Sequence, residues 1–283
     1  MDSITTISSV QNPQIKAVCL LQQKSSQRRK EGLFVVEGRR ELMHCIQQGY
    51  EVEKLYICPE ILNAADTRER SSKGEEARQI NKLIADKPIY NVTPQVYDKM
   101  AYRGGTEGII ATVRQKPHTL DNLSQENPTP LYVVIEGIEK PGNLGAILRT
   151  ADAAGVDAVI VCAPQVDIYN PNLIRSSMGA VFSVEIASCT TPECIAMLKE
   201  RKIKILTAQL QDSRLYYDTD MTCSTAIVMG TEDTGLTPQW REAAEAHIRI
   251  PMLGAMDSLN VSVSAAILIF EAVRQRNSIL TYK

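Results

Sequence analysis

The sequence predicts an α/β protein whose larger part is a mostly parallel sheet flanked by helices. In the second half of the chain, helical patterns separate apolar runs rich in β-branched residues, at 131–138, 157–162, 202–210 and 224–230. These runs are continuously apolar, so both faces of each strand are expected to be covered by helices. Glycine-punctuated loops with isolated polar or charged residues follow several of the runs, which is typical of ligand sites in α/β proteins.

The first part of the chain predicts a smaller α/β unit. Residues 34–38 and 54–58 are short apolar runs expected to form buried strands, and a helical pattern at 40–49 that ends in glycine lies between them. Two further strand candidates follow at 89–93 and 108–114.

A polar segment with three prolines and no periodicity, 115–130, separates the two parts and is interpreted as a linker. The sequence therefore predicts a first domain at 1–115, a linker at 116–130 and a second domain at 131–283.

Composition is that of a globular protein, with 44% hydrophobic and 23% charged residues among 283. No apolar run approaches the roughly 18–20 residues of a membrane-spanning helix, and the first residues lack the order of a signal peptide. A cytoplasmic location is expected. The formal net charge of −2 does not indicate a nucleic-acid partner, although a local basic cluster at 24–30, followed by Arg39, could bind one.

The seven cysteines are scattered, without a C-x-x-C pair, and are interpreted as small buried hydrophobes in a reducing compartment. Only three histidines exist, and none lies near two cysteines at ligand spacing, so no metal is expected. The shortage of histidine also argues against a Ser-His-Asp hydrolase.

The first polar loop leads into a helical pattern at 144–154. Asn143 is placed to cap its start, Gly155 follows its end, and Arg149 projects off the apolar face. Spacing alone leaves two interpretations open: Asn143 is only a cap and Arg149 only a surface or interface ion pair, or both serve a site.

The second loop begins where an apolar strand ends at Gly230, a residue that lets a ligand approach the backbone closely. Glu232 follows, and with Asp233 it could simply form a solvated turn. Thr237 and Pro238 then predict a helix start, with Thr237 as the cap.

The third loop follows the apolar strand end at 250–252 and leads into a long helix through Ser258, Leu259 and Asn260. Either polar residue alone could be a helix cap. A helix cap requires only one polar side chain, and here two of them flank Leu259.

These loops, taken in order, resemble the three signature motifs of the SpoU (TrmH) family of knotted S-adenosylmethionine-dependent RNA ribose 2′-O-methyltransferases. The matching residues are Asn143, Gly145, Arg149, Gly230, Glu232, Gly235, Ser258, Leu259, Asn260 and Ser262. General rules of chain topology predict an ordinary open sheet. The resemblance instead implies a deep trefoil knot formed after about residue 227. The first domain resembles, through shorter motifs, a ribosomal-protein-like RNA-binding domain.

The resemblance also implies roles. Arg149 resembles the family's catalytic arginine, and the other residues implied in catalysis are Asn143, Glu232, Ser258 and Asn260. Residues implied in binding S-adenosylmethionine are Gly230, Ile250, Leu259, Met229, Thr231, Met252 and Ser258. Residues predicted to contact RNA are Lys24, Arg28, Arg29, Lys30 and Arg39. A homodimer through the C-terminal domain is implied.

The chemistry favours a particular role for Arg149. A guanidinium has a pKa of about 12 or more, so a neutral arginine base would be costly. We hypothesise that Arg149 acts as a fixed positive charge beside the developing alkoxide or the adjacent phosphate, and that a phosphate oxygen or water takes the proton.

Ribosomal RNA is the predicted substrate, with transfer RNA as the alternative. A Rossmann-type oxidoreductase fits poorly, because the first loop lacks the full G-x-G-x-x-G pattern. A non-catalytic RNA-binding or ribosome-assembly protein on the same fold is the remaining alternative.

Overall fold

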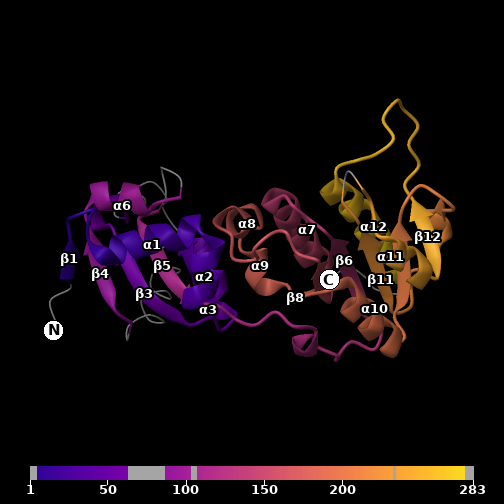
Figure 1. Cartoon of the computed structure of the whole chain (residues 1–283), viewed down its shortest axis with the longest axis horizontal. Coiled ribbons are helices and arrows are strands. Elements are labelled where there is room, and N and C mark those ends of the chain that lie inside the picture. The colour runs from indigo at the N-terminus through magenta and orange to yellow at the C-terminus, as the bar shows by residue number, and fades with distance from the viewer. Residues whose placement is uncertain (1–4, 63–86, 103–106, 232–233, 278–283) are drawn as a thin grey trace. The chain divides into compact units, whose positions relative to one another are not determined.

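A computed structural model of the chain describes residues 5–62, 87–102, 107–231 and 234–277 (Figure 1). The chain forms two compact units. One comprises Met1–Lys116 and Ile168–Ser183, and the other comprises Pro117–Asp167 and Val184–Lys283. None of the described helices has the length and apolar character needed to cross a bilayer.

The first unit contains a five-stranded mixed sheet in the order β1-β4-β3-β5-β2, in which β5 runs antiparallel to β2 and β3. Its strands are β1 (Thr5–Ile7), β2 (Leu33–Glu37), β3 (Val52–Ile57), β4 (Ile89–Val92) and β5 (Ile109–Arg114). Its helices are α1 (Pro13–Gln23), α2 (Ser25–Glu31), α3 (Arg39–Gln47), α6 (Pro94–Met100), α8 (Pro171–Ser176) and α9 (Ala180–Ser183). The four predicted strands and the helix between the first two are therefore confirmed.

The segment Ile168–Ser183, which carries α8 and α9, belongs to this unit although it follows a strand of the other. Aromatic packing is the physical reason: the ring of Tyr169 stacks on Phe34 with centroids 4.3 Å apart, and Phe182 meets the edge of Tyr50 at 5.2 Å. Such pairs contribute about 0.5–1.5 kcal/mol each beyond the area they bury. Nothing in the local sequence of this segment indicates that placement.

The second unit is built on a seven-stranded sheet, parallel throughout, in the order β10-β12-β9-β11-β6-β7-β8. Its strands are β6 (Leu131–Glu136), β7 (Ala158–Cys162), β8 (Ile186–Cys189), β9 (Lys204–Ala208), β10 (Arg214–Leu215), β11 (Thr225–Met229) and β12 (Ala246–Arg249). Its helices are α7 (Pro141–Ala154), α10 (Thr191–Glu200), α11 (Pro238–Ala243) and α12 (Val261–Asn277), with short 3-10 turns η1 (Leu120–Asn122) and η2 (Tyr216–Asp218).

Helices cover both faces of this sheet, as the continuous apolar runs predicted. On one face, α10 and α11 pack against alternate strand residues, with Trp240 and Leu198 meeting Val134, Ile160 and neighbours in one core cluster. On the other face α7 and α12 pack against each other (Figure 1). The predicted α/β class with a mostly parallel, helix-flanked sheet is confirmed. The trefoil knot stays a prediction.

The last helix, α12, is tied to the sheet at its C-terminal end. The guanidinium of Arg276 donates to the carbonyl oxygens of Met221, at 2.9 Å, and Thr129, at 2.8 Å. Two residues earlier, Arg274 donates two hydrogen bonds to Glu271, which lower the pKa of that carboxyl below its ordinary value. These contacts fix the helix that carries the third loop.

Candidate active site

The three polar loops meet at the carboxyl edge of the parallel sheet, where open α/β sheets place their ligands. A cavity of about 140 Å³ opens there. Its lining comes from the end of β6 and the first loop, from the second loop, and from Val261, the first residue of α12: Ile135, Gly137, Ile138, Glu139, Lys140, Asn143, Gly230, Thr231, Thr234 and Val261.

Asn143 and Asn260 connect the first loop to the third. The Nδ2 group of Asn260 donates to Oδ1 of Asn143 at 3.2 Å, although the two residues lie 117 positions apart. Asn260 is also a helix cap, because its Oδ1 accepts from the backbone N–H of Ser262 at 2.9 Å. The cap interpretation of Asn260 is therefore confirmed, and its amide makes a second contact that a cap does not require.

Asn143 does not cap α7. That helix begins at Pro141, so Lys140 is the capping residue and makes no side-chain cap hydrogen bond, while Asn143 lies inside the first turn. The prediction of a cap is wrong because the helix starts three residues earlier than expected, at Pro141, whose fixed φ suits a first helical position. The amide of Asn143 is thereby left to face Asn260. Gly155 ends the helix in the left-handed conformation, as predicted.

Arg149 projects from α7 and is exposed. The part of the chain that the structure describes provides it with no hydrogen bond or ion pair, so the interpretation as a structural ion pair finds no support there. An unpaired guanidinium on the helix that also carries Asn143 can meet a ligand phosphate or alkoxide without first breaking an internal contact.

Backbone packing shapes the second loop. Thr231 and Gly235 exchange backbone hydrogen bonds at 3.3 and 3.2 Å, and the hydroxyl groups of Thr231 and Thr234 lie 2.7 Å apart. The loop folds back so tightly that a Cβ on Gly230 would lie 2.2 Å from the carbonyl carbon of Gly235. Only glycine fits at that position. Glu232, the predicted functional acid of this loop, lies outside the described residues.

A buried carboxylate that the sequence interpretation missed holds these loops in place. Glu136, the last residue of β6, is 5% exposed and accepts hydrogen bonds from the hydroxyl of Thr191 and from both the N–H and the hydroxyl of Thr237, at 2.8 and 3.0 Å. It thus joins the strand before the first loop to the first turn of α10 and the start of α11. A charged residue that ends an apolar strand is the signal that could have found Glu136.

The same contacts correct the prediction for Thr237. This residue occupies the N-cap position of α11, with Pro238 at the first helical position, as the sequence predicted. Its side chain makes no cap hydrogen bond, because the hydroxyl donates to Glu136 instead. The position is therefore confirmed, and the expected capping role of the hydroxyl is wrong.

Replacing Glu136 with glutamine is expected to lower the free energy of unfolding by about 1–3 kcal/mol, because a buried amide nitrogen would face donors that then lack an acceptor. Urea denaturation of the two proteins measures the difference. Glu126→Gln, at an exposed position in the same unit, is the matched control. Equal losses for the two variants would contradict the anchoring role.

A second, larger cavity of about 440 Å³ lies beside the third loop. It is lined by Leu210, Leu215, Arg249, Ile250, Pro251, Met252, Gly254, Ala255, Met256 and Asp257. The predicted cofactor residues are therefore divided: Gly230 and Thr231 line the smaller cavity, Ile250 and Met252 the larger one, and Met229 is buried in β11.

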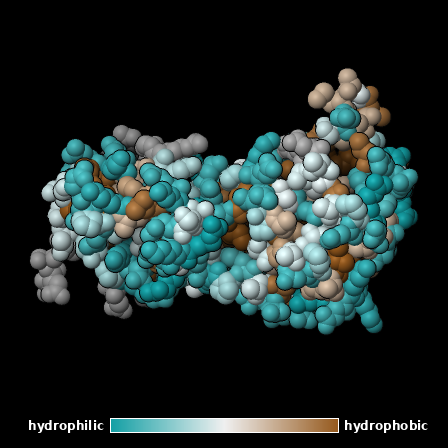
Figure 2. Space-filling view, viewed as in Figure 1, coloured by the Kyte–Doolittle hydropathy of each residue, from teal (hydrophilic) through white to brown (hydrophobic). Residues whose placement is uncertain are grey.

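The loop between β12 and α12 stands away from the rest of its unit, and Figure 1 shows it in yellow above the sheet. It exposes large apolar side chains, with Leu253 97% and Met256 75% accessible, and Figure 2 shows apolar colour at its tip. Ser258 and Leu259 also lie on this loop and are exposed, and neither lines either cavity.

The basic run near the N-terminus divides into buried and exposed members. Arg28 is 2% exposed and donates to the carbonyls of Leu21 and Gln22, at the end of α1, while the buried Arg39 donates to Leu62. Their guanidinium groups are thus engaged with backbone carbonyl oxygens inside the unit. Lys24, Arg29 and Lys30 are exposed, and we restrict the predicted RNA contact to these three.

A parallel sheet with glycine-punctuated loops around a cavity at its carboxyl edge defines an α/β protein with a ligand site at that edge. Family models are consistent with this class. Residues 130–270 match the SpoU rRNA methylase family, and residues 12–111 match the MRM3-like substrate binding domain.

Individual proteins of similar sequence or structure support the same family. The chain is 38% identical over 215 residues to the 23S rRNA (guanosine-2′-O-)-methyltransferase RlmB of Escherichia coli K12, a match that covers 72% of this chain and 88% of the relative. A crystal structure of an RNA 2′-O ribose methyltransferase superposes with a TM-score of 0.79 at 36% identity, covering 96% of this chain and 99% of the other. The SpoU methyltransferase AviRb from Streptomyces viridochromogenes, in complex with AdoMet, has a TM-score of 0.81 at 26% identity over 95% and 99%. The chain belongs to the SpoU rRNA methylase family.

Proposed function

We propose that this protein transfers a methyl group from S-adenosylmethionine to a ribose 2′-hydroxyl of ribosomal RNA, and that a guanosine of 23S rRNA is the target. The observation that carries the proposal is the Asn143–Asn260 hydrogen bond, which unites the first and third family motifs beside the loop at Gly230. The nature of the target is supported by the RlmB relatives, which are named for 23S rRNA guanosine.

The residues present suit the cofactor. The larger cavity combines apolar side chains, among them Leu210, Leu215, Ile250 and Met252, with loop backbone, and its 440 Å³ lies in the range of ligand pockets. These residues, together with Gly230 and Thr231 of the smaller cavity, would hold the adenosyl and methionine parts. When bound, S-adenosylmethionine supplies a methyl group that is already activated, so the protein has to position the acceptor more than to activate the donor.

The protein's own side chains would stabilise the developing charge and orient the acceptor ribose. Arg149 would hold a positive charge near the reacting ribose and stabilise negative charge as the 2′-hydroxyl loses its proton. The joined amides of Asn143 and Asn260 offer further donors and acceptors that could orient the ribose. Glu232 and Ser258 remain proposed members of the site.

We also propose a homodimer through the C-terminal unit. The exposed apolar loop residues Leu253, Met256 and Leu259 are joined by Val263 and Phe270 of α12, which are 46% and 48% accessible. Exposed large side chains of this kind typically mark an interface. A monomeric mass by light scattering at micromolar concentration would contradict this proposal. An rRNA substrate further supports a cytoplasmic location.

Reversing the charges of Lys24, Arg29 and Lys30 to glutamate is expected to weaken RNA binding. The slope of log affinity against log salt should become shallower by about 0.7–0.9 for each phosphate that the protein no longer neutralises. Filter binding at several salt concentrations measures it. A matched triple reversal of the exposed Lys199, Lys202 and Arg214 on the other unit is the control, and equal effects of both triples would remove the N-terminal run from the RNA-binding surface.

The direct test of the function is methyl transfer from labelled S-adenosylmethionine to rRNA and tRNA from cells that lack the protein. Label is expected in 23S rRNA, at a nucleotide whose 3′ phosphodiester then resists alkali. Label confined to tRNA would replace the substrate in this proposal. Absence of both label and cofactor binding would leave a non-catalytic RNA-binding protein.

A further inference from the structure

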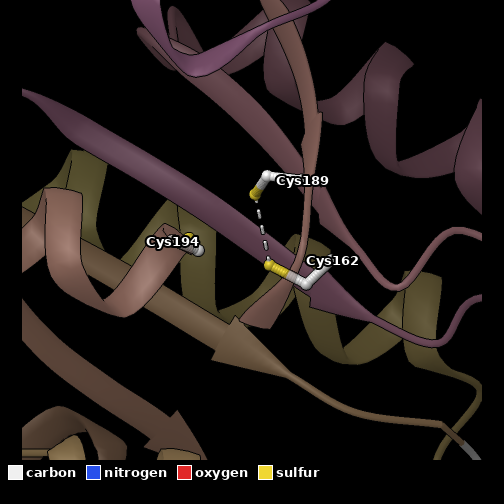
Figure 3. Close-up of side chains that lie close together, drawn as sticks. All are labelled: Cys162, Cys189 and Cys194. Atoms are coloured by element: carbon white, nitrogen blue, oxygen red, sulfur yellow. Dashed lines mark hydrogen bonds between the residues drawn. The ribbon is translucent and has the colours of Figure 1, made fainter. Parts of the chain in front are cut away.

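Three cysteines that are scattered in the sequence meet in the fold of the second unit. Cys162 ends β7, Cys189 ends β8, and Cys194 lies in the first turn of α10. Their sulfur atoms all lie within 4.8 Å of one another, and the Cys162 and Cys189 sulfurs are 3.9 Å apart (Figure 3). Sulfur ligands of a single soft ion are spaced by roughly this distance, as Zn–S bonds of about 2.3 Å illustrate.

The backbone holds the three residues in place. Cys162 and Cys189 are direct partners in the register of two adjacent parallel strands, so neither can slide without breaking the sheet. The first turn of α10 is fixed by a capping box, in which Thr190 and Glu193 each bond to the other's backbone. A sulfur triad on such rigid elements needs little reorganisation to bind an ion.

Burial and access differ among the three. Cys162 and Cys194 are 0% exposed and belong to the apolar core under the sheet, whereas Cys189 is only partly buried at the edge of that core. An ion can therefore reach the triad from the side of Cys189. Within the described residues, no fourth cysteine, histidine or carboxylate joins the group.

These features limit the kind of ion. Structural zinc is almost always held by four protein ligands, and this group provides three. Three thiolates around a divalent or monovalent ion would also leave net negative charge in an apolar core, which is costly. A trivalent ion that prefers three sulfur ligands leaves no net charge. We propose that Cys162, Cys189 and Cys194 form a three-sulfur binding site for a soft trivalent ion of the class represented by arsenite.

The binding step balances without a redox partner. Arsenous acid carries three hydroxyl groups, and each leaves as water with the proton of one thiol. Three As–S bonds replace three As–O bonds, the arsenic stays trivalent, and neither protons nor electrons are left over. Thiols undergo this exchange with arsenous acid to give a neutral product, whereas a divalent metal would have to displace protons into solvent.

Occupancy would also tie the ends of β7 and β8 to α10. Glu136 is the partner of Cys162 in the next strand and holds the first turns of α10 and α11, so the bound ion would stiffen the elements behind the loop at Gly230. A ligand that binds only the folded protein raises its melting temperature by mass action.

The test adds arsenite to the full-length protein kept reduced with a phosphine and free of small thiols. Native mass spectrometry is expected to find one arsenic in place of three hydrogens, and X-ray absorption at the arsenic edge three sulfur neighbours. The melting temperature should rise. Zinc ions at the same concentration should give a smaller shift, and an equal or larger shift would overturn the assignment to a trivalent ion.

Variants locate the site. Cys189→Ser, at the partly buried position, is expected to lose the three-sulfur signature and the melting shift, and Cys194→Ala serves as a second variant. Cys58→Ala, which removes a buried cysteine of the other unit, is the matched control and should keep both. Melting without arsenite verifies that each variant folds. Three sulfur neighbours around arsenic in a folded Cys189→Ser variant would overturn the proposal. So would two sulfur neighbours and one oxygen neighbour around arsenic in the unchanged protein.

Discussion

Replacing Arg149 with alanine is expected to reduce the rate of methyl transfer by roughly 10²–10³-fold, the usual cost of removing one group that stabilises developing negative charge. Arg149 is exposed on α7 and has no hydrogen bond or ion pair within the described part of the chain, so its loss should not lower stability. Single-turnover methylation of rRNA with saturating cofactor measures the rate, and calorimetry measures cofactor binding, which should not change.

Lysine at this position distinguishes charge from geometry. Arg149→Lys keeps a cation but loses the planar, two-pronged donor set. An intermediate rate would mean that both contribute. Lys199→Ala, which removes an exposed cation from α10 on the opposite face of the sheet, is the matched control. An Arg149→Ala enzyme as fast as this control would remove Arg149 from the catalytic machinery.

Gly230→Ala is expected to abolish measurable cofactor binding and to destabilise the protein by about 1–3 kcal/mol, as overpacking usually does. The new methyl group would lie 2.2–2.6 Å from backbone atoms of Gly235 and Leu236, which cannot move aside as a flexible side chain could. The loop would have to open, and with it the wall that Gly230 and Thr231 contribute to the smaller cavity. Calorimetry with S-adenosylmethionine and thermal melting measure the two effects.

Gly142→Ala is the control for this substitution. Gly142 lies in the first turn of α7, and a Cβ there would meet no atom within 4 Å. Alanine favours a helix more than glycine does, so this variant should bind the cofactor normally and melt no lower than the unchanged protein. If Gly230→Ala behaved in the same way, close backbone packing would not explain the glycine.

The family resemblance and the apolar periodicity together predicted most of the second unit. Strands such as β6 and β11 follow from apolar runs that are continuous because helices cover both faces. β8 was missed, because in 186–189 a serine and a cysteine interrupt the apolar pattern and the strand lies at the sheet edge. The helix start at Pro141 also differs from the expected cap at Asn143, since local cap signals compete with tertiary contacts such as Asn143–Asn260.

By itself, the sequence determined the class of sheet, the order of the three polar loops and the glycine at 230, because these depend on local periodicity and on backbone conformations that few residues allow. Only the tertiary structure decided which side chains meet. It joined Asn143 to Asn260, made Glu136 an internal anchor, buried Arg28 and gathered three cysteines at one edge of the sheet. These side-chain contacts depend on strand order and register, which bring together residues that no local sequence pattern connects.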